Sequence, residues 1–198
     1  MELTPKHISG RSDLSRRQFV ALGALAASTL LVPRSLEAAV SAASEGEKEL
    51  SFFHTHTNET LETAYCCDGR YQPAALAEVN HFLRDFRQDE EHPIDPKLLD
   101  LLFALGVELR TRDRYHVISG YRSAKTNLML RARGGEQTGV AVHSLHMVGK
   151  AIDIRVPSVP LDELRKAATS LKLGGVGFYP NSNFVHVDVG RVRYWSGS

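Results

Sequence analysis

The sequence predicts an α+β domain in which helices pack on a mostly antiparallel sheet. Short segments with alternating apolar residues recur along the chain, which is typical of half-buried strands. Between them lie longer segments whose apolar residues repeat at helical spacing. The 198 residues are 42% hydrophobic and 24% charged, an ordinary globular composition that provides enough apolar residues for a packed core.

Residues 1–43 are predicted to be an export signal and linker. The pair Arg16-Arg17 precedes an apolar run at Phe19–Val32 that is rich in Ala and Gly, which is typical of a twin-arginine signal. The run has fourteen residues, whereas a membrane-spanning helix needs about 20. Small residues at 38–43 offer cleavage sites; the alternative is a buried helix or an uncleaved anchor. Residues 44–198 then form a single domain.

The first half of this domain is predicted to hold a strand pair followed by two helices. Pro73 suits the first turn of the first helix, because its missing N–H would have no partner there. Asp95-Pro96 is a typical start for the second helix. The predicted segments are a polar linker at 45–49, strands at 50–57 and 60–65, and helices at 73–88 and 96–109.

The second half is predicted to alternate strands with two more helices. Ser123 can cap a helix with its hydroxyl oxygen, and Gly174-Gly175 ends the last helix. The predicted segments are a strand at 115–119, a helix at 124–133, a loop at 134–142, a strand at 151–156, a helix at 160–171, and strands at 176–179 and 184–189.

Charge and cysteine content exclude several classes of protein. The formal net charge is +1 and no basic patch stands out, which argues against a nucleic-acid partner. The only cysteines, Cys66 and Cys67, are adjacent and cannot form an ordinary loop-closing disulfide. We predict that they are plain strand or turn residues.

Two predicted strands carry residues that can bind a metal ion. His146 and Asp153 are seven residues apart, and Gly149 between them lets the chain turn from a loop into a strand. On the last strand, His186 and Asp188 share one face. If the two strands lie side by side, His146, Asp153 and His186 converge. Two imidazoles and one carboxylate with an open fourth position match a catalytic zinc site.

A hydrolytic zinc site also needs a base for the proton of the water and a cation for the oxyanion. Arg122 is the candidate cation. Asp188 is the candidate base, with fixing of a ligand imidazole as its alternative role, and His143 is a second candidate base. His54 and His56 form another pair that could hold a metal ion, but no acidic or histidine partner lies at suitable spacing nearby.

The motif SxHxxGxAxD at Ser144–Asp153, followed by His186, resembles the LAS metallopeptidases, which include D-Ala-D-Ala peptidases, lysostaphin-type enzymes and the hedgehog fold. Three further segments and the twin-arginine signal resemble the murein endopeptidase K branch of this group. These segments are SGYRS at 119–123, GGVGFY at 174–179 and FVHVDVG at 184–190. The resemblance covers nearly the whole mature chain, from about Leu50 to Trp195.

The resemblance implies a periplasmic zinc hydrolase with a hedgehog-like fold that cuts peptide cross-links between peptidoglycan stem peptides. It implies that His146, Asp153 and His186 bind Zn²⁺ and that Arg122 stabilises the tetrahedral intermediate. No stable membrane insertion is expected after signal cleavage. The alternatives are a D-Ala-D-Ala carboxypeptidase and a non-catalytic, zinc-stabilised wall-binding module.

One position departs from the pattern of many relatives, which carry the base two or three residues before the last ligand. Here those positions are Phe184 and Asn183, and neither side chain can act as a base. The choice of base therefore stays open between Asp188 and His143.

Overall fold

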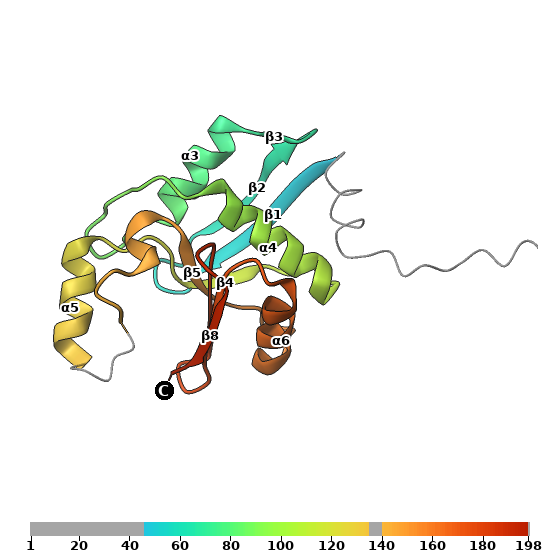
Figure 1. Ribbon diagram of the computed structural model, residues 1–198. Coiled ribbons are helices and arrows are strands. Elements are labelled where there is room, and N and C mark those ends of the chain that lie inside the picture. Colours follow the sequence, from blue (N-terminus) through green and yellow to red (C-terminus); the bar gives the residue numbers. More distant parts are fainter. Residues whose placement is uncertain (1–45, 135–139, 198) are drawn as a thin grey trace, which may run out of the picture. The chain divides into compact units, whose positions relative to one another are not determined.

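The computed structural model describes residues 46–134 and 140–197 (Figure 1). The strands are β1 (Glu47–His54), β2 (Thr60–Cys67), β3 (Arg70–Tyr71), β4 (Tyr115–Ser119), β5 (Ala151–Arg155), β6 (Gly175–Tyr179), β7 (Phe184–Asp188) and β8 (Arg193–Ser196). The helices are α3 (Pro73–Phe82), α4 (Pro96–Leu109), α5 (Ala124–Gly134) and α6 (Leu161–Leu171), with a 3-10 helix η2 (Leu145–Val148). The predicted signal and its cleavage region lie outside the described residues.

The strands form one eight-stranded sheet in the order β3-β2-β1-β4-β5-β7-β6-β8. Only the pairs β1/β4 and β6/β8 are parallel, and the other five pairs are antiparallel. This arrangement confirms the predicted α+β fold with a mostly antiparallel sheet.

Helices fill one face of this sheet. α4 packs on β1 and on α6, and α6 packs on β6 and β7. Ile152 and Ile154 of β5 and Val187 of β7 are fully buried in the same hydrophobic cluster as Leu98 of α4 and Leu164 of α6. Because side chains alternate along a strand, the residues between these positions point to the opposite face.

The opposite face of β5 and β7 carries polar residues at the centre of the sheet. Asp153 and His186 are directly paired across the two antiparallel strands. Each is flanked along its own strand by core residues, so the pleat aims both side chains away from the helices. The predicted shared face of His186 and Asp188 is therefore confirmed by the register.

Gly149 turns the chain from η2 into β5, as the sequence predicts. Its φ is 65°, in the left-handed region that glycine adopts most easily. A Cβ at this position would also collide with the backbone carbonyl oxygen of Pro93. The turn places His146 of η2 beside the start of β5, and so fixes one candidate ligand relative to another.

Several predicted boundaries are wrong. The helix predicted at 73–88 ends at Phe82, because Asp85 pairs with Glu90 across a tight loop instead of continuing the helix. β1 begins at Glu47, inside the predicted linker, because Glu47 pairs with Cys67 of β2. The short elements β3, η2 and β8 were not predicted. The centre of the predicted loop at 134–142 lies outside the described residues.

Other predictions hold at residue level. α4 spans the predicted helix at 96–109, and the Asp95 side chain caps it by accepting a hydrogen bond from the backbone N–H of Lys97. Cys66 and Cys67 lie in β2 and both thiols are free.

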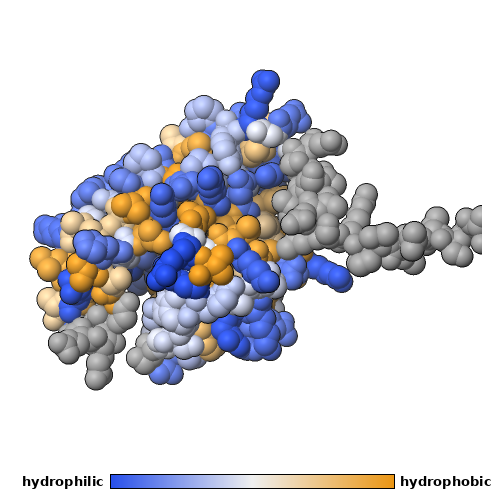
Figure 2. Space-filling model, viewed as in Figure 1, coloured by the Kyte–Doolittle hydropathy of each residue, from blue (hydrophilic) through white to orange (hydrophobic). Residues whose placement is uncertain are grey.

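In the part of the chain that the structure describes, no helix is both long and apolar enough to span a bilayer. The face in Figure 2 mixes hydrophilic and hydrophobic residues.

Candidate metal centre and active site

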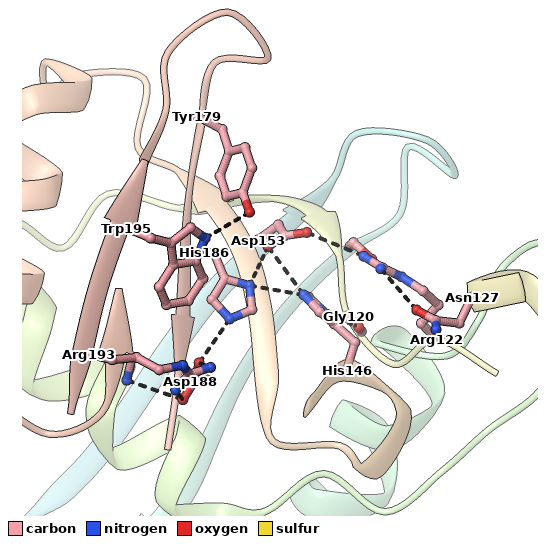
Figure 3. Close-up of polar contacts among 12 residues, drawn as sticks. Gly120, Arg122, Asn127, His146, Asp153, Tyr179, His186, Asp188, Arg193 and Trp195 are labelled. Atoms are coloured by element: carbon pink, nitrogen blue, oxygen red, sulfur yellow. Dashed lines mark hydrogen bonds and ion pairs between the residues drawn. The ribbon is translucent and has the colours of Figure 1, made fainter. Parts of the chain in front are cut away.

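Three side chains from three different elements meet on the face of the sheet opposite the helices. His146 comes from η2, Asp153 from β5 and His186 from β7 (Figure 3). One ligand atom from each residue lies within 4.8 Å of the others. All three residues are buried, with 2%, 5% and 9% of their surfaces exposed respectively. The structure thus brings the predicted ligand set together.

In each histidine, the ring nitrogen that faces away from Asp153 has a hydrogen-bond partner. That partner decides which of the two nitrogens carries the proton. Nδ1 of His146 lies 2.8 Å from the carbonyl oxygen of Gly120, which can only accept, so Nδ1 carries the proton. In a neutral His186, Nε2 likewise donates to Oδ2 of Asp188 at 3.0 Å. The inner atoms, Nε2 of His146 and Nδ1 of His186, then present lone pairs 3.1 Å apart.

These lone pairs face an anionic oxygen. Oδ1 of Asp153 lies 2.9 Å from Nδ1 of His186 and 3.3 Å from Nε2 of His146. Three electron-pair donors at such distances repel one another unless a proton or a metal ion lies among them. The two imidazoles and the carboxylate therefore fit a divalent metal ion chemically as well as in number.

The electrostatics of His146, Asp153 and His186 also favour the binding of a cation. Burial opposes ionisation of Asp153, but the charges and hydrogen bonds of His146 and His186 hold its pKa well below the usual range. Burial likewise lowers the pKa of His146. Burial disfavours a charged His186 too, yet hydrogen bonds to Asp153 and Asp188 raise the pKa of this ring above its ordinary value. The centre thus places an ionised carboxylate between two imidazoles.

Asp188 lies behind His186, on the ring edge turned away from Asp153 (Figure 3). It is fully buried, and both of its oxygens are occupied. Arg193 binds it through two N–H groups at 2.7 and 3.0 Å, and the backbone N–H groups of Gly175 and Gly190 donate to Oδ1 at 3.1 and 2.8 Å. These contacts favour the imidazole-holding role over the role of base.

Arg122 approaches the three candidate ligands from the loop that follows β4. Its side chain is 9% exposed, and Nη2 lies 3.7 Å from Oδ2 of Asp153. Asn127 and Ser119 accept only long hydrogen bonds of 3.5 Å from the guanidinium. Within residues 46–134 and 140–197, its buried Nε has no hydrogen-bond partner. The guanidinium therefore retains donor capacity beside the candidate metal ligands.

A buried carboxylate that the sequence analysis missed holds this loop in place. Asp85 is 1% exposed, and its Oδ2 accepts hydrogen bonds from the backbone N–H and the hydroxyl of Ser123 at 3.0 and 2.6 Å. The Ser123 oxygen in turn accepts from the backbone N–H of Thr126 and caps α5, as predicted. The residue after Arg122 is thus anchored to a segment 38 positions earlier in the chain.

These side chains open into a cavity of about 120 Å³. The described residues that line it are Arg122, Val140, Ala141, Ser144, His146, Asp153, Tyr179, Phe184, His186, Arg193 and Trp195. Neither Asp188 nor the exposed His143 is among them. Tyr179, Arg193 and Trp195 were not predicted as site residues, although the GGVGFY segment ends in Tyr179. Arg193 and Trp195 lie on β8, which was not predicted because it is only four residues long.

His54 and His56, the other histidines that the sequence suggested as a metal-binding pair, lie in a different environment from the candidate metal centre. Nδ1 of His54 accepts hydrogen bonds from the backbone N–H groups of His56 and Thr57, and its ring packs edge-on against Phe82 and Phe86. Among the described residues, His146, Asp153 and His186 are the only group of three or more potential donors placed to share a metal ion.

Comparison with known proteins shows the family of this chain. Residues 42–195 match the family model described as peptidoglycan L,D-endopeptidase MepK. The chain belongs to the MepK family. The matched region contains the three candidate metal ligands, Arg122 and Asp188. Membership of the MepK family confirms the predicted resemblance and identifies the chain as a peptidase.

Individual MepK proteins are similar over almost their full length. The peptidoglycan L,D-endopeptidase MepK of Escherichia coli K12 is 42% identical over 184 residues, which cover 92% of this chain and 98% of the relative. The probable peptidoglycan L,D-endopeptidase MepK of Haemophilus influenzae is 39% identical over 186 residues, which cover 93% and 97% respectively.

Proposed function

We propose that this protein is a zinc-dependent peptidoglycan L,D-endopeptidase that acts in the periplasm on cross-linked stem peptides. The observation that carries this proposal is the convergence of His146, Asp153 and His186 in one cavity with Arg122. The names of the MepK relatives indicate the substrate class, peptidoglycan.

The three ligand residues suit zinc, because Zn²⁺ favours tetrahedral sites with imidazole and carboxylate ligands and an open fourth position in enzymes. When bound, the ion would polarise a carbonyl group and lower the pKa of a water molecule. The carbonyl of Gly120 holds His146 in the correct tautomer, and Asp188 does the same for His186. Such outer partners orient ligands and tune their affinity for the metal.

Arg122 serves the reaction at the carbonyl oxygen of the bond that is cut. This oxygen becomes negative when water attacks the carbonyl carbon, and a guanidinium donor already in place stabilises that charge without reorganisation. The ion pair with Asp153 keeps the Arg122 side chain directed toward the cavity. We assign Asp188 to holding His186 rather than to proton transfer.

The stereochemistry in the relatives' names narrows the choice of cross-link. An L,D-endopeptidase cuts between an L centre on the acyl side and a D centre on the amine side. A D-Ala to diamino-acid cross-link has a D centre on its acyl side, so the bond between two diamino acids fits the name better. We therefore propose this second cross-link as the substrate of this protein.

The experiment uses purified full-length protein with zinc quantified by mass spectrometry and two defined muropeptide dimers. We expect hydrolysis of the dimer linked through two diamino acids and little change in the dimer linked through D-Ala. Removal of the metal by a chelator should abolish hydrolysis and zinc addition should restore it. Release of terminal D-Ala alone would indicate a carboxypeptidase. Binding to the wall without hydrolysis would indicate a binding module.

A further inference from the structure

We propose that Tyr179 is a catalytic residue whose phenolic O–H donates a hydrogen bond to the carbonyl oxygen of the bond that is cut. This inference deepens the proposed peptidase function and rests on it. Tyr179 is the last residue of β6 and lines the same cavity as Arg122 and the three candidate ligands. In Figure 3 its hydroxyl and the Arg122 guanidinium lie on either side of Asp153.

A hydrogen bond from Trp195 defines how the Tyr179 hydroxyl can act. The indole N–H of Trp195 lies 2.9 Å from the phenolic oxygen. An indole can only donate, so the phenolic oxygen accepts and keeps its own proton for another partner. Within residues 46–134 and 140–197, no side-chain hydrogen bond uses that proton. The cavity therefore contains a positioned donor that is ready for substrate.

Packing against a neighbouring aromatic ring also fixes the position of the Tyr179 ring. It stacks on Phe184 with ring centres 4.6 Å apart and an angle of 19° between the planes. Phe184 occupies a position where many relatives of the wider group carry a base. In this chain the residue there contributes an aromatic surface instead, and that surface orients a phenol.

Trp195 links Tyr179 to the candidate metal ligands. Its ring centre is 5.2 Å from that of His186, and the guanidinium of Arg193 lies 4.9 Å above the indole. The indole also crosses Gly177 so closely that a Cβ there would lie 2.6 Å from ring atoms. Since Gly177 pairs with both His186 and Trp195 across the sheet, the donor and the ligand share one rigid frame.

The chemistry of peptide hydrolysis gives this donor a role. The oxygen of a water molecule forms a bond to the carbonyl carbon, and the electron pair of the C=O double bond moves to the carbonyl oxygen. That oxygen then accepts hydrogen bonds from Arg122 and Tyr179. The C–N bond breaks as the electron pair returns, and the proton from the water finally resides on the departing amine. Tyr179 transfers no proton and is restored unchanged.

The test compares Tyr179→Phe with Tyr194→Phe as a matched control. Tyr194 is on β8 outside the cavity, and its hydroxyl donates to the backbone carbonyl of Thr169. For the Tyr179 variant we expect kcat on the cross-linked dimer to fall roughly 10²-fold, with KM and zinc content unchanged. The melting temperature should fall only slightly, because the variant also loses the hydrogen bond from Trp195. Affinity for a phosphinate analogue of the tetrahedral intermediate, measured by calorimetry, should fall by a similar factor. The control should match the wild type throughout.

Other outcomes overturn the inference. An unchanged kcat, or a higher KM with an unchanged kcat, would show that Tyr179 does not act in the transition state. Loss of zinc, or a fall in melting temperature large enough to leave the variant partly unfolded in the assay, would make the residue structural. A wild-type protein that cleaves neither dimer would refute the proposed function itself, and the role of Tyr179 with it. An active wild type with an equally active variant would refute only the role of Tyr179.

Discussion

The carboxylate of Asp188 accepts a hydrogen bond from Nε2 of His186 at 3.0 Å, while Nδ1 of the same ring lies 2.9 Å from Asp153. The imidazole is therefore held between two carboxylates, one in the candidate metal centre and one behind it. Arg193 neutralises the rear carboxylate through two hydrogen bonds. This arrangement gives Asp188 a role that metal-binding measurements can separate from proton transfer.

For Asp188→Asn we expect zinc affinity to fall about 10–100-fold, because the ring of His186 loses an anionic partner. Saturating zinc should restore much of the rate. Competitive chelator titration gives the affinity, and Asp162→Asn on the exposed face of α6 is the matched control. Near-native zinc affinity with most of kcat lost would instead support Asp188 as the base, together with loss of the acidic limb of the pH–rate profile.

Replacing a candidate ligand should remove the metal altogether. For His146→Ala and for Asp153→Ala we expect zinc retention and activity to be lost together, since each variant leaves only two protein ligands. His143→Ala is the control for zinc content, because this histidine is exposed and lies outside the cavity. Full zinc occupancy in either ligand variant would exclude that residue from the centre.

Arg122→Ala should slow the chemical step without affecting the metal. Loss of one transition-state donor costs about 10²- to 10³-fold in kcat, and we expect zinc content to stay at the wild-type level. Arg133→Ala, at the exposed end of α5, removes the same charge without touching the cavity. A wild-type rate in Arg122→Ala would show that the guanidinium takes no part in the reaction.

Asp85→Asn should alter stability in a pH-dependent way. Burial opposes ionisation of Asp85, but hydrogen bonds from Ser123 outweigh it and lower the pKa of the carboxyl group. A lowered pKa in the folded state adds stability above the unfolded pKa of about 3.9, and this stability is lost as pH falls through the folded value. The amide of Asn keeps one acceptor oxygen, so the variant loses the charge and the hydrogen bonds at the other oxygen, which should cost about 2 kcal/mol at neutral pH.

The measurement for Asp85→Asn is denaturant unfolding between pH 3 and pH 7, values chosen to bracket the unfolded pKa. We expect the difference from the wild type to be large at neutral pH and to shrink toward the acidic end. Asp113→Asn, at an exposed position before β4, should show no such difference. A constant difference across the whole range would mean that the Asp85 charge does not contribute.

Export gives an independent prediction for the segment at 1–43. Replacing Arg16-Arg17 by Lys-Lys should leave the precursor in the cytoplasm, because a receptor reads the paired arginines. Cell fractionation with immunoblotting measures this, and Arg11→Lys is the control outside the pair. Normal appearance of the double variant in the periplasm would point to the general secretory route.

The sequence predicted that His146, Asp153 and His186 converge, because the placement of each depends on local rules. Alternation along β5 and β7 decides that Asp153 and His186 leave the core face, and Gly149 decides where the chain turns. Such periodicities are readable without tertiary information. The pairing of β5 with β7 was the one assumption, and the register bears it out.

What the sequence could not predict depends on contacts between distant segments. Asp85 falls within the helix predicted at 73–88, yet its carboxylate binds Ser123 in another part of the chain. Trp195 joins the site only because β8 adds to the edge of the sheet beside β6. Tertiary contacts of this kind override local propensity and leave no periodic signal.

The two hydrogen bonds between the Gly120-Arg122 loop and η2 have a thermodynamic consequence. The carbonyl of Gly120 faces the ring of His146, and the backbone N–H of Arg122 donates to the carbonyl of His146 at 3.2 Å. We expect an ion that binds His146 and a substrate that contacts Arg122 to be coupled through these two hydrogen bonds. If this coupling is favourable, linkage requires each ligand to raise the affinity for the other by the same factor. The protein would thus bind zinc more tightly when its substrate is present.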